Sequence, residues 1–169
     1  MNNEHLDKKR STYAKGKEVT LRLLQADDIE LDLEKVTSVA VVPFDAEGNI
    51  AVAMLDRGLD IPGGHVQKGE TSLTQTAFRE ALEEVFITLD KTKVSCVIES
   101  DLYGTADDQL TYMVILAGTV KEFLQEAPNE ESNGRKIMSI KQFLEEYKAG
   151  DKTLMADILK MAEQTYTEF

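Results

Sequence analysis

The chain has 169 residues, the usual size of one domain, and its 42% hydrophobic content is enough to bury a core without disulfides. Thirty-one acidic against 19 basic residues give a formal net charge of −12, which argues against an extended nucleic-acid interface, because such interfaces need clustered lysines and arginines. A small anionic substrate is compatible with this charge if bound cations offset the repulsion.

The single cysteine, Cys96, lies in an apolar run at 94–98 and is predicted to be a core thiol. One cysteine cannot form an intrachain disulfide, which favours a reducing compartment. The start of the chain is polar and charged, and no window approaches the roughly 20 apolar residues of a membrane span. We therefore expect a cytoplasmic protein with no membrane partner.

Residues 1–16 are polar and carry several cations, so we expect a flexible N-terminal arm before a single domain at 17–169. Apolar and polar residues alternate at 19–24 and again at 29–33, which is typical of half-buried strands. These two runs predict an N-terminal β-hairpin at about 18–35. The hairpin is apolar enough to pair with a second subunit or to cover its own sheet, so a homodimer is one of two alternatives.

The rest of the chain alternates between β-rich and helical segments. Strands are predicted at 36–44 and 50–55, joined by a turn at 45–49 whose glycine can supply positive φ. The other predicted elements are a helix at 71–86, strands at 94–100 and 109–120, a polar loop at 121–135, a helix from Ser139 to Gly150 and a last helix at 153–165. Together they predict an α/β sandwich with helices packed on a mixed β-sheet.

Three glutamates share one face of the predicted helix at 71–86. At 100° per residue, Glu80, Glu83 and Glu84 fall within one arc of about 100°. The opposite side carries an apolar stripe made of Ala77, Phe78, Ala81, Leu82 and Val85. Neighbouring carboxylates repel one another, so Arg79 and a divalent cation such as Mg²⁺ or Mn²⁺ are the expected compensation. A solvated acidic helix without metal is the alternative that this helix alone leaves open.

The loop before this helix favours the metal site. Pro62 ends a strand-like run, and Gly63-Gly64 then predict a sharp turn where the backbone approaches a ligand closely. Gly69 predicts a second bend directly before Glu70. A backbone that lies this close to a ligand can contribute carbonyl ligands or amide donors to a complex of metal and phosphate.

The segment from Gly64 to Ile87 resembles the Nudix box. That motif has a glycine, five residues, a glutamate, seven residues, Arg-Glu, an aliphatic residue, any residue, Glu-Glu, any residue, a glycine and an aliphatic residue. The matching positions are Gly64, Glu70, Arg79, Glu80, Glu83 and Glu84, with Ala81 and Ile87 at the aliphatic places. The resemblance implies a Nudix-like α/β/α sandwich across roughly 36–165. It also implies hydrolysis of nucleoside diphosphates linked to a further group.

The resemblance also implies residue roles. Glu80 and Glu84 become the principal metal ligands, Glu83 a further ligand or a base, and Glu70 and Arg79 residues that orient them. Some members take the base from a loop before a late helix, and Glu131 stands seven residues before Met138. An exposed acidic turn is the other interpretation of that loop. Gly63, Gly64 and His65 are the candidate substrate-binding residues.

Three departures from the motif bear on activity. Eight residues rather than seven separate Glu70 from Arg79, Phe86 replaces the glycine, and Gln67 stands where many members carry another glutamate. Phe86 removes the left-handed cap that glycine provides, so the helix is expected to run on or end differently. These departures keep a second hypothesis alive, a Nudix-fold nucleotide-binding or regulatory module without catalysis. An acidic scaffold without ligand chemistry is the third.

The substrate is less defined than the chemistry. Family members that act on dinucleoside polyphosphates carry a tyrosine 16–18 residues after the box, and Tyr103 lies 16 after Ile87. Members that hydrolyse ADP-ribose often have a proline about 15 residues after the box. No proline occurs between Pro62 and Pro128 here, which disfavours ADP-ribose.

Overall fold

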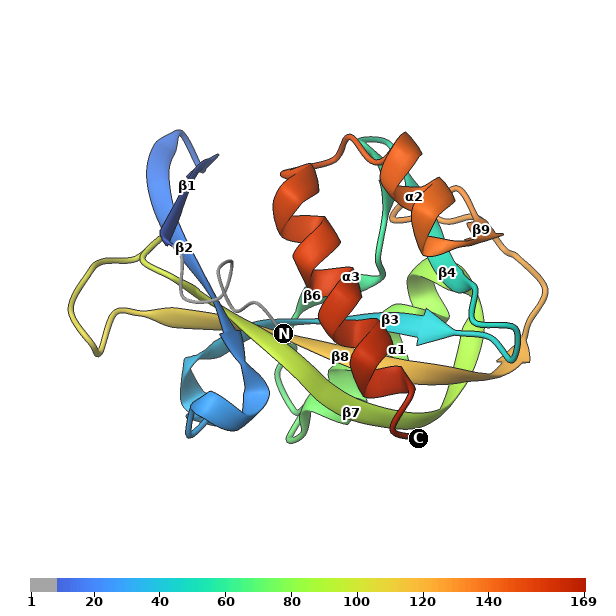
Figure 1. Ribbon diagram of the computed structural model, residues 1–169, viewed down its shortest axis with the longest axis horizontal. Helices are drawn as coiled ribbons and strands as arrows, with labels where there is room; N and C mark the ends of the chain where they lie inside the picture. The colour runs from blue at the N-terminus through green and yellow to red at the C-terminus, as the bar shows by residue number, and fades with distance from the viewer. Residues whose placement is uncertain (1–8) are drawn as a thin grey trace.

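The computed structural model describes residues 9–169, and its strands form one mixed sheet (Figure 1). The strands are β1 (Lys9–Ala14), β2 (Lys17–Gln25), β3 (Val36–Phe44), β4 (Ile50–Leu55), β5 (Gly58–Asp60), β6 (Gly63–His65), β7 (Ile87–Ser100), β8 (Thr111–Phe123) and β9 (Arg135–Met138). The helices are α1 (Leu73–Val85), α2 (Ile140–Glu146) and α3 (Lys152–Tyr166), with short 3₁₀ turns at Ala26–Asp28 and Leu33–Lys35.

The order of strands along the sheet is β1-β2-β7-β8-β3-β4-β5, with β6 paired to β3 and β9 paired to β4. The β3–β8 pair is parallel and the other pairs are antiparallel. The predicted α/β class with a mixed sheet is therefore confirmed. None of the helices in the described part of the chain is long and apolar enough to cross a membrane.

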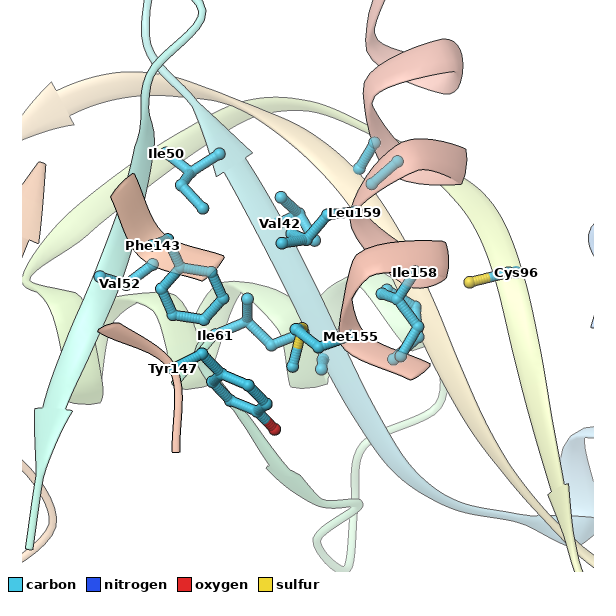
Figure 2. Packing of buried hydrophobic residues seen from close by; sticks show 14 of the residues in the cluster. Val42, Ile50, Val52, Ile61, Cys96, Phe143, Tyr147, Met155, Ile158 and Leu159 are labelled. Atoms are coloured by element: carbon cyan, nitrogen blue, oxygen red, sulfur yellow. The ribbon is translucent and has the colours of Figure 1, made fainter. Parts of the chain in front are cut away.

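Two apolar clusters lie on the two faces of the sheet. Along β3, Ala40, Val42 and Phe44 belong to one cluster and Val39 and Val41 to the other, because successive strand side chains point to opposite faces. The first cluster is covered by α2 and α3, and Figure 2 shows their side chains above β3 and β4. The second cluster is covered by α1. This is the sandwich that the sequence predicts.

The predicted hairpin at 18–35 is wrong in its second strand. Residues 19–24 do form a strand, β2, but its partners are β1 and β7. Ile29 and Leu31 pack against the core from an irregular segment between the two 3₁₀ turns. Their alternation reflects this partial burial and not a ladder, because β1 and β7 already occupy both edges of β2.

The predicted flexible arm falls partly outside the described residues, which begin at Lys9. Residues 9–14 form β1, in contrast to that prediction, and pair with β2 over six positions. Lys15 and Gly16 connect them, and both have positive φ, at 49° and 76°, as two-residue hairpin turns require. The polar composition that suggested an arm is typical of an edge strand.

The later elements follow the sequence prediction more closely. The turn at 45–49 joins β3 and β4, with Gly48 at a φ of 82°. Strand β7 starts at Ile87, earlier than predicted, and Ser139 caps α2 through a reciprocal bond with Gln142. Cys96 is fully buried, and burial raises the pKa of its thiol to about 12, which confirms a core thiol.

Candidate active site

The glycine pair before α1 forms a strand and not the predicted sharp turn. Gly63 and Gly64 lie in β6, which pairs with β3, and neither has positive φ. The close approach is nevertheless present. A Cβ on Gly63 would lie 2.5 Å from the Cβ of Ala40, and a Cβ on Gly64 would lie 2.3 Å from a carboxylate oxygen of Glu80. The glycines therefore let β6 pass directly between β3 and α1.

Helix α1 begins at a capping box and ends at a phenylalanine in the left-handed conformation. Ser72 caps its start through a reciprocal bond with Gln75, a capping box within the segment that holds the extra residue. The bend predicted at Gly69 is present, with a φ of 95°. Phe86 ends the helix by adopting the left-handed conformation itself, at φ 54° and ψ 48°.

Burial explains why Phe86 is tolerated at this position. A left-handed conformation costs a non-glycine residue about 1–2 kcal/mol. The side chain is only 6% exposed, and burying a phenylalanine contributes about 1.5–3 kcal/mol. The burial therefore offsets the strain, and the helix ends at the place where a glycine would end it.

The buried face of α1 differs from the predicted apolar stripe. Ala77, Ala81 and Val85 are fully buried as predicted, but Phe78 and Leu82 are 37% and 48% exposed. Glu80 and Glu84 are buried in their place, at 5% and 7% exposure. The helix packs on its small residues, because the close approach of β6 turns the glutamates inward and leaves the large apolar side chains on the outer face.

Arg79 connects four of the eight other predicted site residues. Its guanidinium donates to carboxylate oxygens of Glu70 at 2.6 Å, Glu80 at 2.6 Å and Glu83 at 3.0 Å, and to the carbonyl oxygen of His65 at 2.9 Å. The Arg79 bond lowers the pKa of Glu70 to about 2. The extra residue between Glu70 and Arg79 therefore does not separate them.

Glu84 lies in the least favourable position for a charge. Its carboxylate accepts a hydrogen bond from the Gly63 N–H at 3.0 Å. Burial raises its pKa to about 7, and the nearby Glu80 and Glu131 add to the rise, while the Gly63 bond and Arg57 oppose it. Burial likewise raises the pKa of Glu80. Burial therefore outweighs the hydrogen bonds and the nearby arginines at both carboxylates.

Glu80, Glu83 and Glu131 converge. One carboxylate oxygen from each lies within 4.8 Å of the others, with Glu80 buried, Glu83 half-buried and Glu131 exposed. Glu84, a predicted metal ligand, is not one of these three, although its charge interacts with those of Glu80 and Glu131. The fold thus brings Glu131, from the loop singled out in the sequence, to the glutamates of α1, which lie almost fifty residues earlier in the chain.

Side chains that the sequence did not indicate hold the Glu131 loop in place. The Asn129 amide donates to the carbonyl of Glu83 at 2.9 Å, and the buried Ser132 hydroxyl donates to the carbonyl of Glu84 at 2.6 Å. The Arg135 guanidinium donates to the carbonyl of Phe86 at 3.1 Å. These donors satisfy the carbonyl groups at the C-terminal end of α1, which have no hydrogen-bond partner within the helix. The sequence around these side chains has the composition of a turn. Only their distance to α1 in the folded chain could have indicated this role.

A cavity of about 400 Å³ opens on the α3 side of the sheet, and Gly63, whose N–H bonds Glu84, connects it to the carboxylates. Gly63 and His65 line it, as does Arg57, whereas Gly64 instead contacts Glu80. The glutamates themselves do not line it. Its volume lies within the roughly 300–1,000 Å³ of small-molecule sites. Its walls were not predicted, because they come from β1, β2, β3, β7, β8 and α3.

The residues present fit a hard divalent cation. Glu70, Glu80, Glu83, Glu84 and Glu131 together outnumber the nearby Arg79 and Arg57, so negative charge remains in excess. Their donor atoms are all carboxylate oxygens, which Mg²⁺ and Mn²⁺ prefer.

Comparisons with known proteins agree with this geometry. The NUDIX domain family matches residues 34–158 of the chain. A search of curated proteins found no match.

Three solved structures show similar folds. One is a mutant of a pyrophosphohydrolase from Bacillus subtilis, 18% identical, with a TM-score of 0.68 over 89% of this chain and 91% of that one. A NUDIX hydrolase from Nitrosomonas europaea is 18% identical, with a TM-score of 0.61 over 78% and 90%. The NUDIX domain of Shewanella oneidensis NrtR, solved with ADP ribose, is 12% identical, with a TM-score of 0.59 over 80% and 90%.

Proposed function

The chain belongs to the Nudix family, and on this premise we propose that it is a metal-dependent hydrolase of phosphoric anhydrides. In this proposal it cleaves the pyrophosphate linkage of a nucleotide or of a small molecule linked to a nucleoside diphosphate. The convergence of Glu80, Glu83 and Glu131 within 4.8 Å carries the proposal, because a divalent cation needs oxygen ligands gathered at one place.

We assign metal binding to Glu80, Glu84 and Glu83, with Mg²⁺ or Mn²⁺ as the cation. Such a cation, when bound, neutralises charge on phosphate oxygens and lowers the pKa of water. The burial of Glu80 and Glu84 limits their motion, and the Gly63 N–H fixes one oxygen of Glu84. Arg79 orients Glu80 and Glu83, while Glu70 orients Arg79 in turn.

Glu131 is the general base in this proposal. Its carboxylate is exposed, so water reaches it, and it stands within the same group of oxygens as Glu80 and Glu83. It accepts the proton of the water that attacks phosphorus. Glu83 is the alternative base, because it is the more exposed of the two α1 glutamates in that group.

The cavity beside the carboxylates receives the group linked to the pyrophosphate. Arg57 and His65 line it, so the guanidinium and the imidazole can contact phosphate oxygens. Gly63 belongs to both places, since its N–H bonds Glu84 and its backbone lines the cavity. With its phosphates bound at the glutamates, the substrate therefore has its remaining part in the cavity.

One observation favours the second hypothesis, a nucleotide-binding or regulatory module. Arg79 holds Glu80 and Glu83 in ion pairs of 2.6 Å and 3.0 Å, and both carboxylates must still face a cation for catalysis. A module that binds nucleotides without turnover would keep the same cavity.

The test measures phosphate-bearing products from a panel of nucleotides and nucleoside diphosphate-linked molecules with Mg²⁺ and with Mn²⁺. The enzyme hypothesis expects turnover of at least one member with a cation, and none in its absence. Tight binding of a nucleotide without metal, together with no turnover of any member, would overturn it in favour of the binding module.

Two further expectations belong to this proposal. We propose a cytoplasmic location, since the chemistry draws on nucleotides and the single cysteine cannot form an intrachain disulfide. A homodimer stays a prediction, although β1 now occupies the edge of β2 on which it was based. Sedimentation at micromolar concentration tests it, and a monomer would remove it.

A further inference from the structure

The N-terminal hairpin β1–β2 forms one wall of the cavity. Arg10, Ser11, Thr12, Lys15 and Leu21 all line it. These residues lie before the segment at 34–158 that matches the family. The wall is therefore an addition to the part of the chain that carries the glutamates.

We infer that this hairpin selects the substrate, because it closes the cavity around the nucleoside end of a nucleoside diphosphate. The inference rests on the proposed function, which places the phosphates at the glutamates. It assigns Arg10 and Asp157 as positioning residues that hold the wall, and Lys15 and Tyr103 as the residues at the mouth.

An ion pair ties the hairpin to the last helix of the chain. An Arg10 guanidinium nitrogen lies 2.5 Å from a carboxylate oxygen of Asp157 in α3, and the two side chains are only 10% and 21% exposed. Asp157 sits between Met155 and Ile158, both of which line the cavity. In Figure 1 the hairpin, at one edge of the sheet, rises on the side of the sheet that α3 covers. The pair therefore sets the distance between two cavity walls.

A second contact closes the outer end of the hairpin. The Lys15 ammonium donates to the Tyr103 hydroxyl at 3.2 Å and lies 5.2 Å from the centre of its ring. Both residues line the cavity, and Tyr103 comes from the loop between β7 and β8. This contact is exposed, so it is weaker than the Arg10 pair and can open to admit a ligand.

The interior fits the flat, mostly apolar body of a nucleobase. Its floor consists of apolar side chains, among them Ile61, Ile98, Ile115 and Met155. Asp60 and Tyr147 add a carboxylate and a hydroxyl at the wall, so hydrogen-bonding groups of both kinds face the cavity. A charged phosphate would lose its hydration against such a floor, which favours the base over a phosphate as its neighbour.

The size of the cavity limits the occupant to one nucleoside. About 400 Å³ is near the lower end of small-molecule sites, which run from roughly 300 to 1,000 Å³. An oligonucleotide would have to pass the Lys15–Tyr103 contact and would meet a protein of net charge −12. The observations therefore favour a free nucleotide derivative over a nucleic-acid chain.

The experiment compares Arg10→Ala and Asp157→Asn with the unchanged protein on substrates that share one leaving group and differ only in the base. We expect each variant to raise KM about tenfold for the preferred base, with kcat changed less than about twofold, and to narrow the preference among bases. The charge-exchanged pair Arg10→Asp with Asp157→Arg should recover most of the KM. Glu99→Gln is the matched control, because it breaks the Arg22–Glu99 pair of the same hairpin away from the cavity.

A binding measurement separates this inference from the proposed function. Calorimetry of adenosine, guanosine, cytidine and uridine monophosphates is done without metal on the same variants. Loss of base preference in Arg10→Ala, with Glu99→Gln unchanged, supports the inference even if the protein turns over no substrate. Equal affinities and equal KM values across the unchanged protein, Arg10→Ala and Asp157→Asn would overturn it.

Discussion

The carboxylate end of the candidate site and the cavity beside it are built in different ways. The carboxylate end comes mainly from one stretch of chain, where Arg79 contacts Glu70, Glu80, Glu83 and the His65 carbonyl. The cavity is closed by a contact between Arg10 and Asp157, which stand 147 residues apart. Candidate catalytic residues can therefore be identified from local sequence spacing, whereas the residues that shape the substrate cavity can be identified only from the whole fold.

The largest expected effect concerns the carboxylate end. Glu80→Gln removes a buried charge that Arg79 and Glu131 both face. We expect kcat to fall about a thousandfold, the size of effect seen when a preorganised charged group is lost from an active site. KM should change little, because Glu80 does not line the cavity. Steady-state kinetics with Mg²⁺ measures this, and a kcat within tenfold of the unchanged protein would contradict the division between the two ends.

Loss of the contact between the Glu131 loop and α1 should lower kcat less than loss of Glu80 does. Ser132→Ala removes the hydroxyl that donates to the Glu84 carbonyl, so the Glu131 loop loses one anchor to α1. We expect kcat to fall about tenfold with KM unchanged, since such supporting contacts typically contribute 10–100-fold. Glu130→Gln, at an exposed neighbouring residue, is the matched control. A larger change in KM than in kcat would place the loop with the cavity instead.

The pH dependence of stability is the smallest expected effect. Without metal, Glu84 has a pKa raised to about 7 when folded, above its ordinary value of 4.5. The folded protein therefore binds the proton more tightly, and this contribution to stability is present below pH 4.5 and lost as pH rises through 7. A divalent cation replaces the proton, so it should raise Tm more at pH 8 than at pH 5. Thermal unfolding with Mg²⁺ and with EDTA measures this, and an equal rise at both values would contradict it.

The sequence predicted the chemistry of α1 better than its packing. The spacing of Glu80, Glu83 and Glu84 places them on one face in any helix, so no other part of the chain is needed to predict it. The exposure of Phe78 and Leu82 could not be predicted, because it depends on how closely β6 approaches the helix. The helical spacing of the apolar residues predicted an apolar stripe, whereas the helix packs on the smaller ones.

In the N-terminal region the sequence predicted less regular structure than the chain forms. Its polarity suggested an arm, yet β1 pairs with β2 over six positions. An edge strand has one face toward solvent and no second ladder, so its composition resembles that of a loop. The Lys15-Gly16 turn was the available signal, since a glycine at the second place suits a two-residue hairpin. The partner of Arg10 in α3 had no signal at all in the local sequence.

Titration of Mn²⁺ into the metal-free protein by calorimetry tests the central claim, that the α1 glutamates form a metal site. We expect binding in the unchanged protein and affinity lowered at least about tenfold in both Glu80→Gln and Glu83→Gln. Glu145→Gln, an exposed residue of α2, should leave the affinity unchanged. Equal Mn²⁺ affinity in all four proteins would contradict the claim, because the cation would then be held elsewhere.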